Sequence, residues 1–456
     1  MDADLNIIHG RTDEAAIVTT TDSAPAGRGI SRHKQLVEAY VSLSLFMVVY
    51  CARPEDWIPG LSNVPLAKIA GVLALIAFLL SLGEIRQRFP REVIFLVLLT
   101  VQLFATVPMS PVWMGGAFST TLDFAKVLLI VLVTVLAVNT AKRLRRLLLI
   151  QAASVAAISA VAVWKGRMIG SRLEGVLNGN YSNPNDLALA IVISLPLCLA
   201  LLFLGRNVVW KAAWAFAMVV MAYAVFLTGS RGGFLALAMT IGVCLWEFAI
   251  RGRRTYLLVL TGVAVVVLWI ASSAILGERL MGTFNSKEDV ESAYGSSQAR
   301  QELFWRSIEV TLRHPLFGVG PGNFQVMSGS WHQTHNSYTQ MSSEGGLPAL
   351  ILYVMILWCG FKNVKAAKRL ARSNRELTLI AGALHASLAG FAVGSFFSSY
   401  AYQFFPYFLV AYTTALLWIV KKSTGQSKDE KSASPAALLE EPNTGTSRSG
   451  LSWHSY

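Results

Sequence analysis

Two side chains in this sequence have the chemistry to bind a phosphate and to activate a hydroxyl, and they are Arg231 and His335. Arg231 lies in the segment Leu-Thr-Gly-Ser-Arg-Gly-Gly-Phe-Leu (227–235), between two long apolar runs. A guanidinium at a membrane edge is costly without a partner, and a phosphate or pyrophosphate fits its planar fork best. The competing interpretation is an interfacial arginine that reaches lipid headgroups. Gly232 and Gly233 would allow close approach to a phosphate, and would equally suit tight helix packing.

His335 is the candidate catalytic residue. It lies in Trp-His-Gln-Thr-His-Asn-Ser-Tyr (331–338), and an imidazole can take a proton from a hydroxyl near neutral pH. The alternative is a structural histidine bonded to the loop backbone. Glu344 could orient His335 or accept its proton, or it could favour the start of the following helix. His332 and His335 form an H-x-x-H pair, but no further ligands stand at metal spacing, so we expect no metal site.

A second arginine with a possible phosphate role is Arg172, in a polar segment that ends in Asn-Pro-Asn at 183–185. Lys165 and Arg167 are alternatives for the same contact. Asn-Pro-Asn is also an ordinary turn and helix-start signal.

A third candidate, Arg300, opens a helix that we predict over Ser297–His314. That helix has apolar positions at Leu303, Phe304, Ile308 and Leu312. Arg300 could reach an anionic headgroup or a pyrophosphate, or it could simply be a solvated helix arginine.

The composition identifies a membrane protein. Of the 456 residues 54% are apolar and only 14% are charged, which a soluble domain of this size could not accommodate. The net charge of +13 first suggests nucleic acid as a partner. Most lysines and arginines lie in short loops between apolar runs, however, which is typical of charges that set topology and contact anionic lipids. We therefore expect membrane lipids and no nucleic acid as partners. The four cysteines form no C-x-x-C pair, so we expect core residues.

The apolar runs predict an all-α polytopic membrane protein with about twelve transmembrane helices. The spans fall near 36–52, 66–82, 92–107, 121–140, 146–164, 186–204, 210–228, 233–250, 255–276, 345–361, 377–398 and 405–420. The loops after even-numbered spans carry most of the basic residues, which predicts that both chain ends are cytoplasmic. The polar ends, 1–35 and 423–456, are predicted to be disordered tails on either side of a 36–422 membrane domain. A large outer loop, 277–344, separates spans nine and ten, and long loops are usually functional.

Three ordered segments resemble the O-antigen ligase and Wzy-type polymerase superfamily. They are Thr-Gly-Ser-Arg-Gly-Gly-Phe (228–234), His-Pro-Leu-Phe-Gly-Val-Gly-Pro-Gly-Asn-Phe (314–324), and His-Asn-Ser at 335–337 followed by Glu-Gly-Gly at 344–346. The resemblance covers about 210–360. It implies a membrane glycosyltransferase whose periplasmic loop covers the active site.

The resemblance also implies roles for the candidate residues. Arg231, with Arg172 and Arg300, would bind the pyrophosphate of an undecaprenyl-pyrophosphate-linked glycan, and His335 with Glu344 would serve catalysis. The acceptor would be another glycan, lipid A core or a glycoprotein, and no cofactor or metal is implied. The protein would be a bacterial inner-membrane enzyme with its site facing the periplasm. The rival interpretation is a transporter or flippase of the same lipid-linked glycan, for which inverted repeats and broken mid-membrane helices would be expected.

Overall fold

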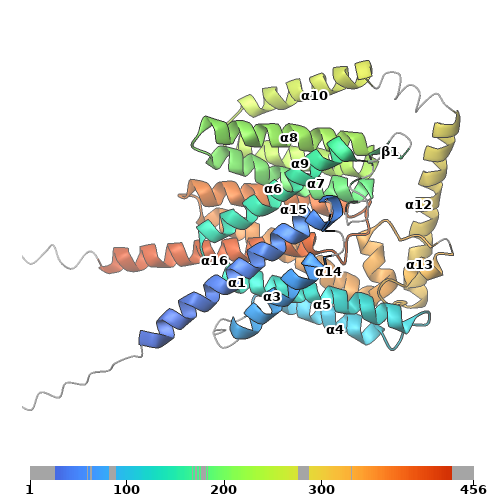
Figure 1. The fold of residues 1–456 in the computed structure, drawn as a ribbon, viewed down its shortest axis with the longest axis horizontal. Coiled ribbons are helices and arrows are strands. Elements are labelled where there is room, and N and C mark those ends of the chain that lie inside the picture. Colours follow the sequence, from blue (N-terminus) through green and yellow to red (C-terminus); the bar gives the residue numbers. More distant parts are fainter. Residues whose placement is uncertain are drawn as a thin grey trace, which may run out of the picture.

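The computed structural model describes residues 26–58, 60–61, 64–81, 89–166, 168–169, 172–173, 175, 181, 183–275, 287–329 and 331–433. Helices dominate this part of the chain (Figure 1). They are α1 (Ala26–Ala52), α2 (Pro54–Trp57), α3 (Leu66–Ser81), α4 (Arg91–Thr106), α5 (Met114–Ala137), α6 (Ala141–Lys165), α7 (Pro184–Leu204), α8 (Val208–Thr228), α9 (Arg231–Cys244), the π-helix η2 (Leu245–Ile250), α10 (Tyr256–Ile275), α12 (Lys287–Arg313), α13 (Phe324–Met327), α14 (Ser337–Leu370), α15 (Arg375–Gly394) and α16 (Phe404–Ala433). Strands β1 (Met168–Ile169) and β2 (Arg172–Leu173) add a short antiparallel hairpin that an all-α prediction omits.

Each of the twelve predicted spans coincides with a helix, the eighth with α9 and η2 together. Eight helical segments in the described chain are long and apolar enough to cross a bilayer, and two shorter apolar helices lie at Leu66–Ala77 and Tyr256–Val267. The protein is therefore a helical, multi-pass membrane protein. Helices α1 and α16 extend to Ala26 and Ala433, into the predicted tails. Residues 1–25 and 434–456 lie outside the described residues.

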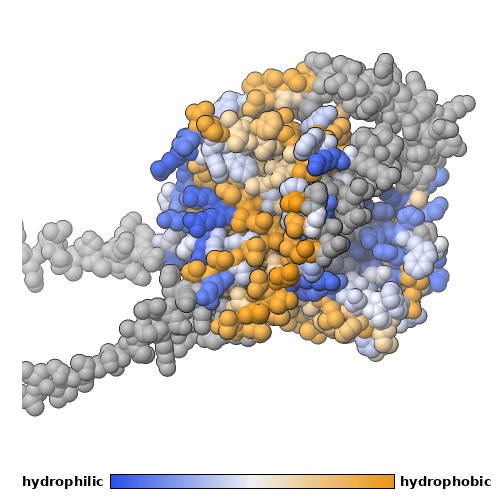
Figure 2. All heavy atoms as spheres, viewed as in Figure 1, coloured by the Kyte–Doolittle hydropathy of each residue, from blue (hydrophilic) through white to orange (hydrophobic). Residues whose placement is uncertain are grey.

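The centre of the bundle is formed by α7, α15 and α16. In their most apolar windows 72%, 72% and 78% of the residues are buried, against 22% in α8. Helix α8 instead turns large apolar side chains outward, such as Phe216 and Val219. Apolar residues cover the flank of the bundle between its ends (Figure 2). Such a surface suits lipid, and helices satisfy their backbone groups internally as a bilayer requires.

The loops that follow odd-numbered spans meet at one end of the bundle, which we call the site end. Hydrogen bonds join them in two groups of three. The first group is joined by Tyr181 Oη to the Cys51 carbonyl (3.0 Å) and Arg172 Nε to the Thr228 carbonyl (3.0 Å), and the second by Ser110 Oγ to the Val319 carbonyl (2.8 Å) and Ser337 Oγ to the Ser398 carbonyl (2.7 Å). Ser398 Oγ then donates to Asp186 Oδ1 at 2.5 Å, which connects the two groups. Helix α12 lies at this end, opposite to the side from which α1 and α16 project (Figure 1).

The loops that follow even-numbered spans meet at the opposite, basic end. Arg145 pairs with Glu376 at 3.2 Å, and Arg375 donates to the Phe203 carbonyl at 3.4 Å. The alternation of basic and non-basic loops in the sequence therefore corresponds to two physical ends of the bundle.

This segregation yields a prediction about sidedness. Gln298 at the site end and Asn207 at the basic end are both exposed. In a variant without native cysteines, Gln298→Cys should react with a membrane-impermeant thiol reagent in intact cells, because the basic loops should face the cytoplasm. Asn207→Cys should react only after permeabilisation. If only Asn207→Cys were labelled in intact cells, the basic end would face outward and the predicted orientation would be wrong.

Candidate active site

The turn between α8 and α9 presents Arg231. Gly229 ends α8 in the left-handed conformation, with φ of 58°. Ser230 caps α9, because its Oγ accepts a hydrogen bond from the backbone N–H of Gly233 at 3.1 Å. Arg231 is the first residue of α9 and is exposed at the site end. The free backbone N–H groups of a first helical turn favour an anion, and the guanidinium of Arg231 adds a full positive charge at the same place.

Asn185 connects this turn to Arg172. The Asn185 Oδ1 accepts hydrogen bonds from Ser230 Oγ at 2.7 Å and from Arg172 Nη2 at 3.2 Å. Asn183 caps α7 and accepts from the backbone N–H of Asn185 at 2.9 Å. The helix-start interpretation of Asn-Pro-Asn is thus confirmed for Asn183. The role of Asn185 as the junction was not predicted, and the Asn-Pro-Asn segment was the signal that pointed to this place.

Arg172 is the member of the Lys165, Arg167 and Arg172 group that joins this cluster. Besides Asn185 it contacts the Thr228 carbonyl through Nε at 3.0 Å. These two bonds occupy two of the five guanidinium N–H groups and fix the side chain in a half-buried position. Lys165 is exposed, with its ammonium 5.0 Å from the centre of the Trp164 ring. Arg167 lies outside the described residues.

The two glycines after Arg231 serve helix packing. A Cβ on Gly232 would lie 2.3 Å from the Cβ of Phe397, and one on Gly233 would lie 2.7 Å from the Cβ of Ala188. Both distances are far below van der Waals contact, so α9 approaches its neighbours closely only because these residues have no side chain. Of the two interpretations of the Gly-Gly pair, close packing is the one with contacts in the structure.

Arg300 does not open its helix, as the sequence predicted, but lies well inside α12, which begins at Lys287. The buried stripe of α12 also differs from the predicted one. It contains Leu303, Ser307, Val310 and Thr311, whereas Leu312 is 73% exposed. Hydroxyl groups are stable on this stripe because they are bonded: Ser307 Oγ donates to the Phe304 carbonyl and Thr311 Oγ1 contacts Ser342 Oγ at 2.8 Å. Arg300 precedes Leu303 and Ser307 by three and seven residues, so it lies on the stripe that faces the bundle.

Arg172, Arg231 and Arg300 therefore come from three separate segments and meet at the site end. Burial lowers the pKa of the Arg172 guanidinium, and the positive charges of Arg300 and Arg231 lower it further. The pKa of Arg300 is likewise lowered by burial and then by Arg231. All three groups stay charged. Within the described residues no carboxylate forms an ion pair with Arg172 or Arg300, so the cluster is a site of concentrated positive charge.

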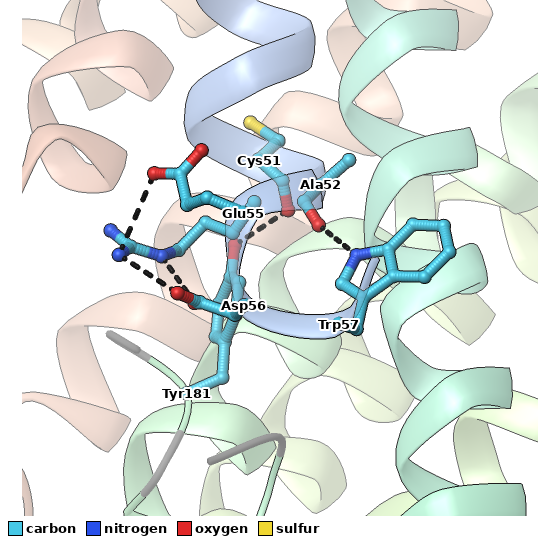
Figure 3. A network of polar contacts seen from close by, with 7 residues as sticks. Cys51, Ala52, Glu55, Asp56, Trp57 and Tyr181 are labelled. Atoms are coloured by element: carbon cyan, nitrogen blue, oxygen red, sulfur yellow. Dashed lines mark hydrogen bonds and ion pairs between the residues drawn. The ribbon is translucent and has the colours of Figure 1, made fainter. Parts of the chain in front are cut away.

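A fourth arginine at the same end shows the contrast. Arg53 pairs with Asp56 at 2.5 Å and with Glu55 at 3.7 Å. Glu55 and Asp56 both turn toward this guanidinium beside the bond between Tyr181 and the Cys51 carbonyl (Figure 3). The charge of Arg53 is thus balanced within the protein. The arginine cluster is suited to an external anion, whereas Arg53 serves the structure.

The glycine-rich segment is the part of the loop that Glu344 holds. Gly318, Gly320 and Gly322 all have positive φ, between 62° and 94°. The buried Glu344 carboxylate accepts hydrogen bonds from the backbone N–H groups of Gly322 at 2.9 Å and Phe324 at 3.4 Å. The structure therefore gives Glu344 a loop-anchoring contact set, and its predicted roles of orienting His335 or accepting a proton stay predictions without a contact that supports them.

His335 is held in a left-handed backbone conformation, with φ of 52°, which is uncommon for a residue with a side chain. The residues on each side fix it. Thr334 Oγ1 donates to the Asn336 carbonyl at 2.9 Å, and Asn336 Oδ1 caps α14 by accepting from the N–H groups of Tyr338 and Thr339. A backbone held in this way at a candidate catalytic position is a reason to look for function there.

Electrostatics keep His335 neutral. Burial lowers its pKa to about 4, with further lowering from the nearby charges of Arg300 and His332. An imidazole without a proton on one nitrogen can accept one from a hydroxyl. The charge of Arg300 thus acts on His335, and Arg300 is the one residue of the arginine cluster for which this is seen.

His332 is exposed and lies at the edge of a groove along α12. Within the described residues no group of three or more histidine, cysteine, aspartate or glutamate side chains could hold a metal ion. The predicted absence of a metal site stays a prediction that requires a chelator experiment.

Comparison with known proteins gives one family match. Residues 216–354 match the family model described as O-antigen ligase, and a comparison with curated proteins finds no match. The matched region includes Arg231, Arg300, His335 and Glu344. Arg172 lies outside it and is connected to it through Asn185.

Close packing at Gly232 leads to a prediction with an internal control. Gly232→Ala should destabilise the protein by about 1–3 kcal/mol, because the new methyl group overlaps Phe397. Gly242→Ala, in the same helix with nothing within 4 Å of the added Cβ, should be neutral or stabilising by up to about 1 kcal/mol. Thermal unfolding of both variants in detergent measures this. Equal thermal unfolding midpoints for the two variants would show that α9 can move away from Phe397 without loss of stability.

The neutral state of His335 leads to a second prediction. With a pKa of about 4, its reactivity toward diethyl pyrocarbonate, which attacks neutral imidazole, should be nearly equal at pH 5 and pH 7. An ordinary histidine with a pKa of about 6.5 would react roughly 25 times more slowly at pH 5. Mass spectrometry of the His335 peptide gives the two rates.

Arg300→Gln removes a positive charge and should raise the pKa of His335, so that His335 reacts more slowly with diethyl pyrocarbonate at pH 5. Arg300→Lys keeps the charge and should leave this rate unchanged. If His335 in the unsubstituted protein reacts about 25 times more slowly at pH 5 than at pH 7, its pKa is ordinary and the proposed environment is wrong.

Proposed function

We propose that this protein is an inner-membrane glycosyltransferase, because residues 216–354 match the family model described as O-antigen ligase. Its donor is a glycan linked to undecaprenyl pyrophosphate, and it transfers or polymerises that glycan at the periplasmic face. The observation that carries the proposal is the convergence of Arg172, Arg231 and Arg300 beside a neutral His335. A pyrophosphate has the charge and geometry that such a cluster requires.

In the proposed reaction an acceptor hydroxyl attacks the anomeric carbon of the donor sugar. The new carbon–oxygen bond forms as the bond to the pyrophosphate oxygen breaks, and the hydroxyl proton passes to the imidazole of His335. The arginines stabilise the charge that develops on the departing pyrophosphate. No cofactor enters this scheme, and we propose that the reaction needs no metal, because the three guanidinium groups supply the positive charge.

The two parts of the site are coupled electrostatically. Positive neighbours contribute to the low pKa of His335 in the unliganded protein. A bound pyrophosphate adds negative charge beside the same arginines, which raises the pKa of His335 and makes it a stronger base. Donor binding therefore prepares His335 to accept the proton, and the base is weak when the donor is absent.

The membrane arrangement follows from the loops. We propose twelve spans with both chain ends in the cytoplasm, since the basic loops gather at one end of the bundle. The site end then faces the periplasm, where the loop 277–344 covers the arginine cluster. The acceptor, whether a growing glycan, lipid A core or a glycoprotein, approaches from that side.

A paired loss of function tests the assignment of roles. Arg231→Lys keeps the charge but loses the guanidinium fork, so it should weaken donor binding and lose on the order of 2–4 kcal/mol of transition-state stabilisation, roughly 30- to 900-fold in rate. His335→Ala should abolish transfer while donor binding persists. Both are measured with purified protein in detergent, with a labelled lipid-linked oligosaccharide, as binding and as transfer in parallel.

Lys165→Gln is the matched control, because Lys165 is a cation at the same end that lies against Trp164. It should leave binding and transfer unchanged, and so should a chelator. Full activity of His335→Ala would remove the catalytic assignment. Movement of the donor across a liposome membrane by a protein that transfers no glycan would identify a transporter instead.

A further inference from the structure

A groove of about 920 Å³ runs along α12 on the face away from Arg300. One wall is a side of α12 that includes Gln298, Gln301, Glu302 and Trp305, and the other is formed by Ser328, Gly329 and His332. This volume lies in the range of ligand sites. The wall from Gln298 to Glu309 extends over about 16 Å of helix, which suits an elongated ligand.

The groove is built and held in place. Arg306 Nε donates to the Met327 carbonyl at 2.9 Å, which joins the two walls. The Trp305 ring packs edge-on against Phe304, with ring centres 5.6 Å apart and planes at 71°. Trp305 nevertheless stays 60% exposed, so one face of a fixed aromatic ring is presented to a ligand.

The chemistry of the walls is that of a carbohydrate site. Gln298 and Gln301 each offer an amide that donates and accepts, and Glu302 offers a carboxylate acceptor, which together match vicinal hydroxyl groups. The apolar face of a sugar ring can stack on Trp305, because its C–H groups meet the negative face of the aromatic ring. Glu302 and Arg306 have opposite charges, and Glu309 bonds with Arg313 outside the groove. The groove is thus nearly neutral, in contrast to the arginine cluster on the other face of α12.

The position of the groove indicates which substrate it holds. His332 lines the groove, and His335 follows it by three residues along the chain. An extended chain spans at most about 3.6 Å per residue, so the backbones of the two residues lie within roughly 11 Å of each other. His335 is therefore close to the groove wall that His332 forms. An attacking hydroxyl must approach the anomeric carbon from the side away from the leaving pyrophosphate. The side away from the arginines is the groove side.

We propose that the groove between α12 and the wall of Ser328, Gly329 and His332 binds the carbohydrate chain of the acceptor and delivers its terminal hydroxyl to His335. This inference rests on the proposed function, since it presumes that an acceptor sugar is glycosylated at His335. Trp305 is its stacking residue and Gln301 with Glu302 are its hydroxyl-binding residues. They determine acceptor affinity and take no part in donor binding.

Direct binding tests the groove independently of catalysis. The probe is the core oligosaccharide of the host cell's own lipopolysaccharide, freed of lipid A by mild acid, and the measurement is calorimetry on the full-length protein in detergent. Trp305→Ala should weaken binding about five- to tenfold, the loss of roughly 1 kcal/mol expected for one stacking contact. Leu312→Ala, an exposed apolar residue of the same helix outside the groove, should bind as the unchanged protein does. No binding by the unchanged protein, or equal binding by Trp305→Ala, would overturn the proposal.

Steady-state transfer separates acceptor from donor. Trp305→Ala should raise the KM for the acceptor five- to tenfold and change the KM for the donor less than twofold. A rise in the donor KM alone would assign the groove to the donor chain and overturn the acceptor assignment. If the unchanged protein binds the oligosaccharide but transfers nothing from any lipid-linked donor, the proposed function fails while the carbohydrate groove stands.

Discussion

The site end of this protein is organised around concentrated positive charge at the edge of a membrane bundle. Guanidinium groups from β2, α9 and α12 repel one another and lose hydration together, so fixed neighbours must hold them. Asn185 is the main fixed neighbour, because its side-chain oxygen accepts hydrogen bonds from both Arg172 and the capping residue Ser230. Positive groups that are gathered and held in this way favour a ligand with the opposite charge.

Charge is handled differently at the basic end. Glu247, in the π-helical turn η2, contacts Lys368 at 2.6 Å and His385 at 2.9 Å, and all three helices involved are joined by this contact. Here the buried charges of Glu247 and Lys368 are partners of each other, and the contacts of Glu247 join α14, α15 and η2. Ionisable groups in this membrane bundle thus have two uses. Those at the basic end connect helices, and those at the site end are proposed to bind a substrate.

The sequence predicted the helices well, because apolar runs long enough to span a bilayer leave few alternatives. It also located Arg231 and His335 in loops that meet. It misplaced the start of α12 and the burial of Leu312, because an amphipathic helix was assumed to bury its apolar side chains. The stripe that packs on α14 instead contains Ser307 and Thr311, whose hydroxyls are satisfied by local bonds. It also could not reveal that Asn185 joins two distant segments, or that Glu344 binds backbone N–H groups of the glycine-rich segment, since both depend on long-range contacts.

The left-handed backbone positions between residues 314 and 346 constrain the order in which the protein folds. Gly318, Gly320, Gly322 and Gly346 all have positive φ, and so does His335. Gly320 fits against Ser110 and Ala117, and Gly322 against Thr120. Ala117 and Thr120 belong to α5 and Ser110 to the segment before it, and all three are synthesised much earlier than the loop. Conformations of this kind persist only when their surroundings impose them. We infer that the loop acquires its shape last, after the bundle has assembled beneath it, and that it is the first region to open when stability declines.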